Sequence, residues 1–410
     1  MLNRLLAQRD SLAFLVATTL AYGLDYLFNV VSGRLLGPTQ FSILVALAGV
    51  GQIMVVGSRV IQTVTTRYVS GFRADTHDEK VRPFIVAALR SGVWGALVVT
   101  VLLCVLAIPL ANFLRIDDLP TVFALMGGVG LMVIRPIIGG TLQGQQRFLP
   151  LGIIQIVQAG SRLLFGAGLI LLGWGAFGAM VALPIASTIA LVFGVWLLRD
   201  LLRGTNAAPD ATPLRELARY SGYTAAGLIG FAILINMDAI LVKRFFDADT
   251  AGTYGAAVTL GKVVQFFPVA VIMVMFPKAA NRQATQRNPA AVLPPAFGII
   301  TLVCLGVSLL YFAFPDLLVG TLFGDEFAVS GRTLGTLGLA MWLLSLTNVW
   351  LNYFLSLNQT RFVALIWVGV VAQYVTFTIW NDALWQLPTI MAINALWLTV
   401  AGAIIFSITR

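Results

Sequence analysis

Seven ionisable residues lie inside long apolar stretches of this sequence. They are Arg59, Arg90, Arg135, Arg162, Lys262, Asp25 and Asp238. A charge is costly to place in hydrocarbon, so these side chains are expected to face a protected interior or a water-filled cavity. Five of the seven are cations, and an arginine fork binds phosphate oxygens through two parallel hydrogen bonds. The pattern predicts a cationic, substrate-binding cavity suited to phosphate, displaced toward the N-terminal half, where the four arginines lie.

Arg59 and Arg90 also fit a role outside a cavity. Arg90 lies about two turns into its apolar stretch, and Arg59 lies near one end of its own. Long basic side chains in such places can extend their charged heads to the membrane interface. For the cavity wall we favour Arg135, which Pro136 follows, and Arg162.

The two carboxylates, Asp25 and Asp238, allow two interpretations. Each could bind a coupling proton or sodium ion, or each could simply neutralise a nearby cation. They lie 213 residues apart (238 minus 25), close to the spacing of an internal repeat described below. If that repeat holds, both occupy matching positions.

The apolar stretches that must position these residues fill most of the chain. Of its 410 residues, 59% are hydrophobic and 10% are charged, whereas an ordinary soluble domain has about 25% charged residues. A membrane-spanning helix needs about 20 apolar residues, which predicts about twelve spans in an all-α polytopic membrane protein. The expected spans are near 11–33, 41–65, 83–112, 122–142, 151–172, 177–198, 220–242, 254–276, 291–314, 334–355, 363–379 and 388–408.

Basic residues gather in the loops that this map places on one side of the membrane, chiefly 67–82, 199–219 and 278–287. Cytoplasmic loops carry an excess of lysine and arginine, so these loops and both termini are expected in the cytoplasm. The net charge of +9 then follows from topology and from contact with anionic membrane lipids. No nucleic-acid partner is expected.

An internal repeat is visible in the segments that follow the fourth and tenth spans. Leu142-Gln143-Gly144-Gln145-Gln146-Arg147-Phe148 resembles Leu357-Asn358-Gln359-Thr360-Arg361-Phe362, at an offset of 214 residues (361 minus 147). Two halves of six spans that start on the same side predict two bundles related by a pseudo-twofold axis along the membrane normal. The expected bundles are 1–204 and 214–410, joined by a cytoplasmic linker at 205–213.

Other motifs are expected to be structural. Cys104 and Cys304 lie in separate apolar stretches, and His77 lies in a charged loop, so we expect no disulfide and no metal site. The segment 173–178 matches a dinucleotide-binding glycine pattern but lacks the strand that such a site needs, and no cofactor is expected. The pair Gly140 and Gly144 favours close packing of helices.

Five short segments together resemble the polysaccharide-transport branch of the multidrug/oligosaccharidyl-lipid/polysaccharide exporter superfamily, which includes the O-antigen-unit flippases. These segments are Gly33-Arg34-Leu35-Leu36-Gly37-Pro38-Thr39-Gln40-Phe41, Leu142-Gln143-Gly144 with Arg147-Phe148, Asn236-Met237-Asp238, Gly252-Thr253-Tyr254-Gly255-Ala256-Ala257 and Phe276-Pro277-Lys278. The resemblance runs from about residue 12 to the C-terminus.

The resemblance implies a MATE-like fold, in which two six-helix bundles alternate between inward-open and outward-open states. It further implies a flippase of the bacterial inner membrane that moves polyprenyl-pyrophosphate-linked oligosaccharide during polysaccharide biosynthesis. The cationic cavity inferred above would bind the pyrophosphate. Lipid-linked oligosaccharide is the expected partner, and other polysaccharide assembly proteins fit beside it. No enzymatic activity is expected.

Two other functions stay open at this point. A cation or drug antiporter of the same fold is the main alternative, although such proteins tend to have acidic cavities and the cations counted above are in excess. A membrane-embedded polysaccharide polymerase would need a sizeable outer catalytic loop. The longest outer segment expected here, 314–332, is short and contains no histidine.

Overall fold

The structure is a computed structural model that describes residues 2–74, 78–202, 214–357 and 359–409. Within these ranges every regular element is a helix, in agreement with the predicted all-α class. Three earlier expectations fall outside the described residues: the loop position of His77, the linker 205–213 and residue 358 of the repeated motif.

The chain divides into two compact units by its internal packing. The first unit holds residues 1–36 and 54–219, and the second holds 37–53 and 220–410. Residues 37–53, which the repeat assigned to the first bundle, are thus grouped with the second. The predicted bundle limits at 204 and 214 stay a prediction.

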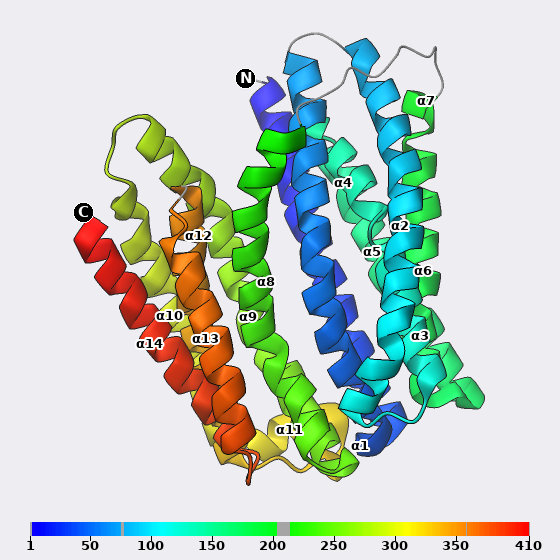
Figure 1. Cartoon of the computed structure of the whole chain (residues 1–410), viewed down its shortest axis with the longest axis vertical. Coiled ribbons are helices and arrows are strands. Elements are labelled where there is room, and N and C mark those ends of the chain that lie inside the picture. The colour runs from blue at the N-terminus through cyan, green and yellow to red at the C-terminus, as the bar shows by residue number, and fades with distance from the viewer. Residues whose placement is uncertain (1, 75–77, 203–213, 358, 410) are drawn as a thin grey trace. The chain divides into compact units, whose positions relative to one another are not determined.

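The first unit contains most of one very long helix and six further helices (Figure 1). They are α1 (Leu2–Ala74), α2 (Asp78–Leu114), α3 (Leu119–Leu131), α4 (Arg135–Gly144), α5 (Phe148–Leu169), α6 (Gly175–Leu197) and α7 (Arg199–Leu202). A short π-helical segment, η1 (Ile170–Trp174), joins α5 to α6.

The second unit contains residues 220–245 of α8, six complete helices and two short 3-10 turns, together with residues 37–53 of α1. The helices are α8 (Leu214–Phe245), α9 (Ala248–Ala284), α10 (Leu293–Ala313), α11 (Pro315–Phe323), α12 (Gly331–Ser356), α13 (Arg361–Ile379) and α14 (Gln386–Thr409). The turns are η2 (Pro289–Val292) and η3 (Asp325–Phe327).

Ten segments of the described chain are long and apolar enough to cross a membrane. Two of these are too long for one crossing, at 60 and 50 residues, and each contains a break. Gly37 has φ 69° within α1, and Gly173 has φ 86° within η1. Glycine adopts such left-handed backbone conformations without steric cost. Division at these glycines recovers about twelve spans, so the chain is a multi-pass membrane protein as predicted.

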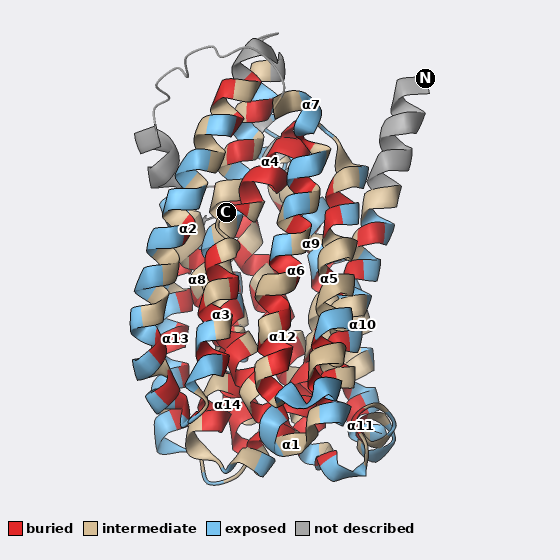
Figure 2. Cartoon of the chain, turned by 90° about the vertical axis from the view of Figure 1, so that its right-hand side faces the viewer, coloured by how far each residue is buried: buried red, intermediate tan, exposed pale blue. Residues whose placement is uncertain are grey.

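The outer faces of several helices are apolar, as hydrocarbon contact requires. Along α2, Trp94, Leu97, Val101 and Val105 are each more than half exposed and recur at intervals of three and four residues. This spacing places them on one face of the helix. Figure 2 shows exposed and buried residues alternating in this way along the helices. An apolar stripe of this extent is typical of a lipid-facing surface.

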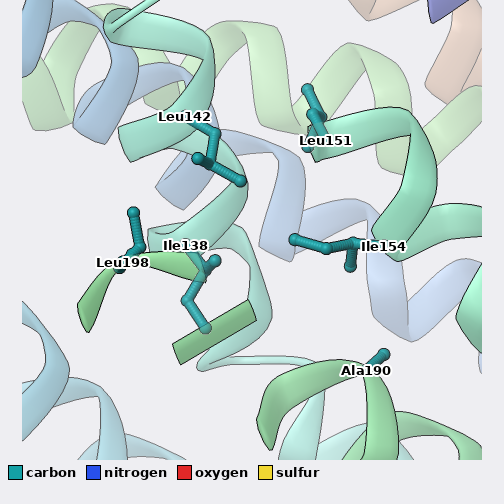
Figure 3. Packing of buried hydrophobic residues seen from close by; sticks show 6 residues of the cluster. All are labelled: Ile138, Leu142, Leu151, Ile154, Ala190 and Leu198. Carbon is teal, nitrogen blue, oxygen red and sulfur yellow. The ribbon is translucent and has the colours of Figure 1, made fainter. Parts of the chain in front are cut away.

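The core of the first unit lies where α4, α5 and α6 meet. One buried cluster consists of Ile138, Leu142, Leu151, Ile154, Ala190 and Leu198 (Figure 3). It fixes α4 against its neighbours. The cluster therefore holds the short helix that carries Arg135.

The glycine pair of α4 packs against the part of α1 that belongs to the same unit. A Cβ atom at Gly140 would lie 2.6 Å from the carbonyl oxygen of Gln62, and one at Gly144 would lie 2.9 Å from that of Thr66. Beside them, the Gln62 amide donates a hydrogen bond to Gln143 Oε1 at 3.1 Å. The predicted packing role of this glycine pair is confirmed.

Replacing Gly140 by valine should therefore destabilise the first unit. A side chain at this position must push the α1 backbone away, and overpacking of this kind costs about 1–3 kcal/mol or more. Thermal unfolding of the purified protein, followed by intrinsic fluorescence, should show a lower Tm for Gly140→Val. The control is Gly127→Val, because a Cβ at Gly127 meets nothing within 4 Å. Equal Tm values for the two variants would contradict the packing described here.

Candidate functional site

Arg135 lies at a break in its predicted span. Helix α3 ends at Leu131, residues 132–134 form a turn, and α4 begins at Arg135 with Pro136 next to it. Proline suits the first turn of a helix, where its missing N–H costs nothing. The span 122–142 is thus discontinuous. The guanidinium of Arg135 at this break favours an anion.

Arg135 also has unused hydrogen-bonding capacity. Its Nη1 is buried and finds no hydrogen-bond partner among the described residues. A buried guanidinium nitrogen without an acceptor is costly. The site therefore favours a ligand that supplies an acceptor oxygen.

Arg162 of α5 is held from two sides. Its Nη1 lies 3.5 Å from Oδ1 of Asp25 on α1, and its guanidinium carbon lies 4.3 Å above the ring centre of Phe28. The ring and the carboxylate fix the plane of the guanidinium. Its Nε is buried and has no partner in the described part of the chain. The guanidinium of Arg162 is therefore fixed in place, and one of its hydrogen-bond donors is still available.

Asp25, Arg135 and Arg162 form a charge cluster within the first unit. Besides its ion pair with Arg162, Asp25 interacts electrostatically with Arg135. Two cations and one carboxylate leave a net charge of +1 (2 minus 1). The Asp25 side chain is 45% exposed, so the cluster is open to a ligand. In chemical terms, the two arginines can bind the oxygens of an incoming phosphate in place of the carboxylate of Asp25.

No ion pair or side-chain hydrogen bond among the described residues joins Arg59 or Arg90 to this cluster. Both side chains are exposed, Arg59 on α1 and Arg90 on α2, and neither forms an ion pair within the described ranges. Their exposure fits a place on a cavity wall, and it equally fits side chains that extend their charged heads to the membrane interface. Their assignment to the binding site stays a prediction.

The second unit contains a buried carboxylate of a different kind. Asp238 of α8 is fully buried, and its Oδ2 accepts a hydrogen bond of 3.0 Å from the hydroxyl of Tyr254 on α9. Its Oδ1 has no partner among the described residues. Lys262, which is partly buried on α9, interacts with Asp238 electrostatically. A buried carboxylate with one hydrogen bond favours the binding of a proton or a cation.

The two aspartates therefore have different surroundings despite their matching sequence positions. Asp25 is partly exposed and paired with an arginine, whereas Asp238 is buried beside a tyrosine. Sequence reasoning did not select Phe28 or Tyr254 as site residues. Phe28 lies three residues after Asp25, on the same helix face. Tyr254 belongs to a quoted motif, Gly252–Ala257, but nothing in that motif indicated a partner on α8.

Comparison with solved structures assigns the fold. A structure described as the inward-facing conformation of a multidrug resistance MATE family transporter of the MOP superfamily matches 96% of this chain and 98% of its own, with a TM-score of 0.76 and 12% identity. A MOP superfamily transporter from Pyrococcus furiosus matches 98% of this chain and 96% of its own, with a TM-score of 0.64 and 14% identity. That transporter is described as having a binding pocket of reversed polarity, which suggests a different function. The chain thus has the fold of the MATE transporters.

Sequence comparison identifies the family. An uncharacterized membrane protein from Methanocaldococcus jannaschii is 20% identical over 295 residues, which cover 67% of this chain and 68% of that protein. The model of the family described as polysaccharide biosynthesis protein matches residues 7–281. The chain belongs to this polysaccharide biosynthesis protein family. The resemblance inferred from the short motifs is confirmed.

Proposed function

We propose that this protein moves polyprenyl-pyrophosphate-linked oligosaccharide units across the bacterial inner membrane by alternating access. The observation that carries the proposal is the charge cluster of Asp25, Arg135 and Arg162. Within a family devoted to polysaccharide biosynthesis, two partly buried arginines with unused nitrogens suit the pyrophosphate of a lipid-linked glycan. A transport role is favoured over an enzymatic one because the fold is that of transporters.

In the charge cluster, the pyrophosphate of the substrate would replace the carboxylate of Asp25 as the anion bound to the arginines. Without substrate, Asp25 neutralises Arg162 and keeps the buried guanidinium from standing alone. A pyrophosphate offers more acceptor oxygens than a carboxylate and can bridge both arginines. Binding would free Asp25 toward its exposed side. Arg59 and Arg90 of the first unit and Lys262 of the second are further cations that we assign to substrate binding.

For energy coupling we favour Asp238 over Asp25. Asp25 lies 3.5 Å from Arg162. Its role in neutralising this arginine is enough to explain a carboxylate at this position. Asp238 is buried with one free carboxylate oxygen. A proton or sodium ion bound there in one state and released in another would bias the transport cycle.

A cation or drug antiporter is the second candidate, favoured by the MATE fold and by the buried Asp238. Proteoliposomes can separate the two functions. We expect the purified protein to move a short prenyl-pyrophosphate-linked oligosaccharide between leaflets, measured by its access to an added glycosidase. A lipophilic dye cation such as ethidium should not accumulate. Dye accumulation without glycan movement would overturn the flippase proposal in favour of the antiporter.

A further inference from the structure

An apolar groove lies within the second unit, between α10, α12 and α14. Its volume is about 420 Å³, and its walls include Pro294, Phe297, Trp350, Val400, Ala403 and Phe406. Val400 is half exposed, so the groove is accessible from outside the protein. Its lining residues include neither Asp238 nor any residue of the charge cluster.

Trp350 lines the groove and carries an unsatisfied donor. Its side chain is 6% exposed, and its ring lies 5.1 Å from that of Phe297 and 5.6 Å from that of Phe406. The ring packs against α14 so closely that a Cβ atom at Gly402 would lie 2.7 Å from it. Its Nε1 is buried without a hydrogen-bond partner in the described ranges. A buried N–H without an acceptor is costly, so an acceptor atom of a bound molecule would stabilise it.

Basic residues lie beside one end of the groove. Ala290, in the η2 turn, lines it, and the Asn288 side chain caps that turn by accepting from the Ala290 N–H at 3.0 Å. Arg282 donates to the carbonyl oxygen of Asn288 at 3.3 Å, which places its guanidinium near this end. Arg287 is exposed three residues before Ala290. The groove is therefore apolar along its walls and cationic near its mouth.

We propose that this groove binds an anionic glycerophospholipid of the surrounding membrane. One acyl chain would fill the apolar groove, and the phosphate would lie near Arg282 and Arg287. An ester carbonyl would accept the hydrogen bond of Trp350 Nε1. Trp350 lies six residues before the end of α12 at Ser356, which is about 9 Å along the helix axis. That depth suits the ester region, just below the headgroups of a bilayer.

The unsatisfied indole distinguishes this occupant from a polyprenyl chain. An isoprenoid chain is apolar enough for the groove but carries no carbonyl oxygen along its length. It would leave the indole N–H unpaired. A glycerolipid satisfies the indole and the basic residues together. The inference does not depend on the proposed glycan substrate.

Lipid binding can be measured on the full chain in detergent by native mass spectrometry. We expect dioleoyl phosphatidylglycerol to bind more tightly than dioleoyl phosphatidylcholine, which has the same chains and esters without the net charge. Trp350→Phe keeps the ring and removes the donor, so it should weaken phosphatidylglycerol binding about fivefold to tenfold. Val400→Phe should weaken it by filling the groove, and Arg282→Gln with Arg287→Gln should abolish the preference for the anionic lipid.

Matched controls lie on α13, outside the groove. Trp367→Phe and Val368→Phe change exposed residues of the same types and should leave lipid binding unchanged. The proposal is overturned if Trp350→Phe and Val400→Phe bind phosphatidylglycerol like the unmodified protein. It is also overturned if geranylgeranyl phosphate binds more tightly than phosphatidylglycerol and its binding does not respond to Trp350→Phe. The groove would then be an isoprenoid site.

Discussion

Replacing Arg135 and Arg162 together by alanine should reduce glycan flipping by at least about 100-fold. Each arginine would make charge-assisted hydrogen bonds to the pyrophosphate, and such bonds contribute about 1.5–3 kcal/mol each. Loss of two corresponds to a factor of about 10² to 10⁴. Lysine at both positions should restore part of the activity, because it keeps the charge but lacks the planar fork. The measurement is the initial flipping rate in proteoliposomes.

The Arg162 substitution needs its own control, because it leaves Asp25 without its partner. Breaking a partly buried pair is destabilising in itself. Arg162→Ala should therefore be compared with Arg162→Ala, Asp25→Asn, which removes both charges. If both are inactive and the second retains the Tm of the unmodified protein, the loss reflects substrate binding. Arg199→Gln changes an arginine of α7 that is stacked on Trp196, outside the charge cluster, and should leave flipping intact. Normal flipping by the double alanine variant would refute the phosphate site.

Replacing Asp238 by asparagine should abolish the dependence of transport on an ion gradient while leaving substrate binding in place. Asparagine has nearly the same shape and can still accept the hydrogen bond of Tyr254, but it cannot take up a proton or pair with sodium. Exchange of substrate down its own gradient should persist. Proteoliposomes with imposed proton or sodium gradients, compared with gradient-free vesicles, measure the difference directly.

Two further variants separate coupling from simple structural support. Tyr254→Phe removes the hydrogen bond and keeps the carboxylate, so gradient dependence should remain while stability falls. Asp25→Asn leaves Arg162 unpaired and should lower stability without removing the gradient effect. The coupling role of Asp238 must be abandoned if Asp238→Asn keeps full gradient dependence, or if it loses its fold while Tyr254→Phe does not.

The helices were largely predictable because a helix that crosses a membrane needs a long apolar stretch of sequence. The span limits followed from apolar length, and the breaks at Gly37 and Gly173 lie between predicted spans. Pro136 lies two residues after the turn at 132–134 that interrupts the predicted span. These features are local, since backbone conformation near glycine and proline depends mainly on those residues themselves.

The site was less predictable because its contacts join distant parts of the chain. Nothing in the sequence indicated that Arg162 would meet Asp25 and Phe28, which lie more than 130 residues earlier. The repeat suggested equivalent roles for Asp25 and Asp238, but a repeat predicts backbone position and not the identity of neighbouring side chains. Arg59 and Arg90 were grouped with the cluster by charge alone. The unpaired N–H of Trp350 depends entirely on packing and left no sequence signal.

The close packing of α4 on α1 has a mechanical consequence for substrate binding. Gly140, five residues after Arg135, leaves no room for even a Cβ atom against the α1 backbone at Gln62. Backbones in such contact have little freedom to slide. We therefore expect the part of α1 around Gln62 and the helix α4 to move together. Under the proposed function, a substrate held by the guanidinium of Arg135 would act on α1 through α4, within two helical turns. We therefore expect ligand binding at Arg135 and displacement of this part of α1 to be coupled.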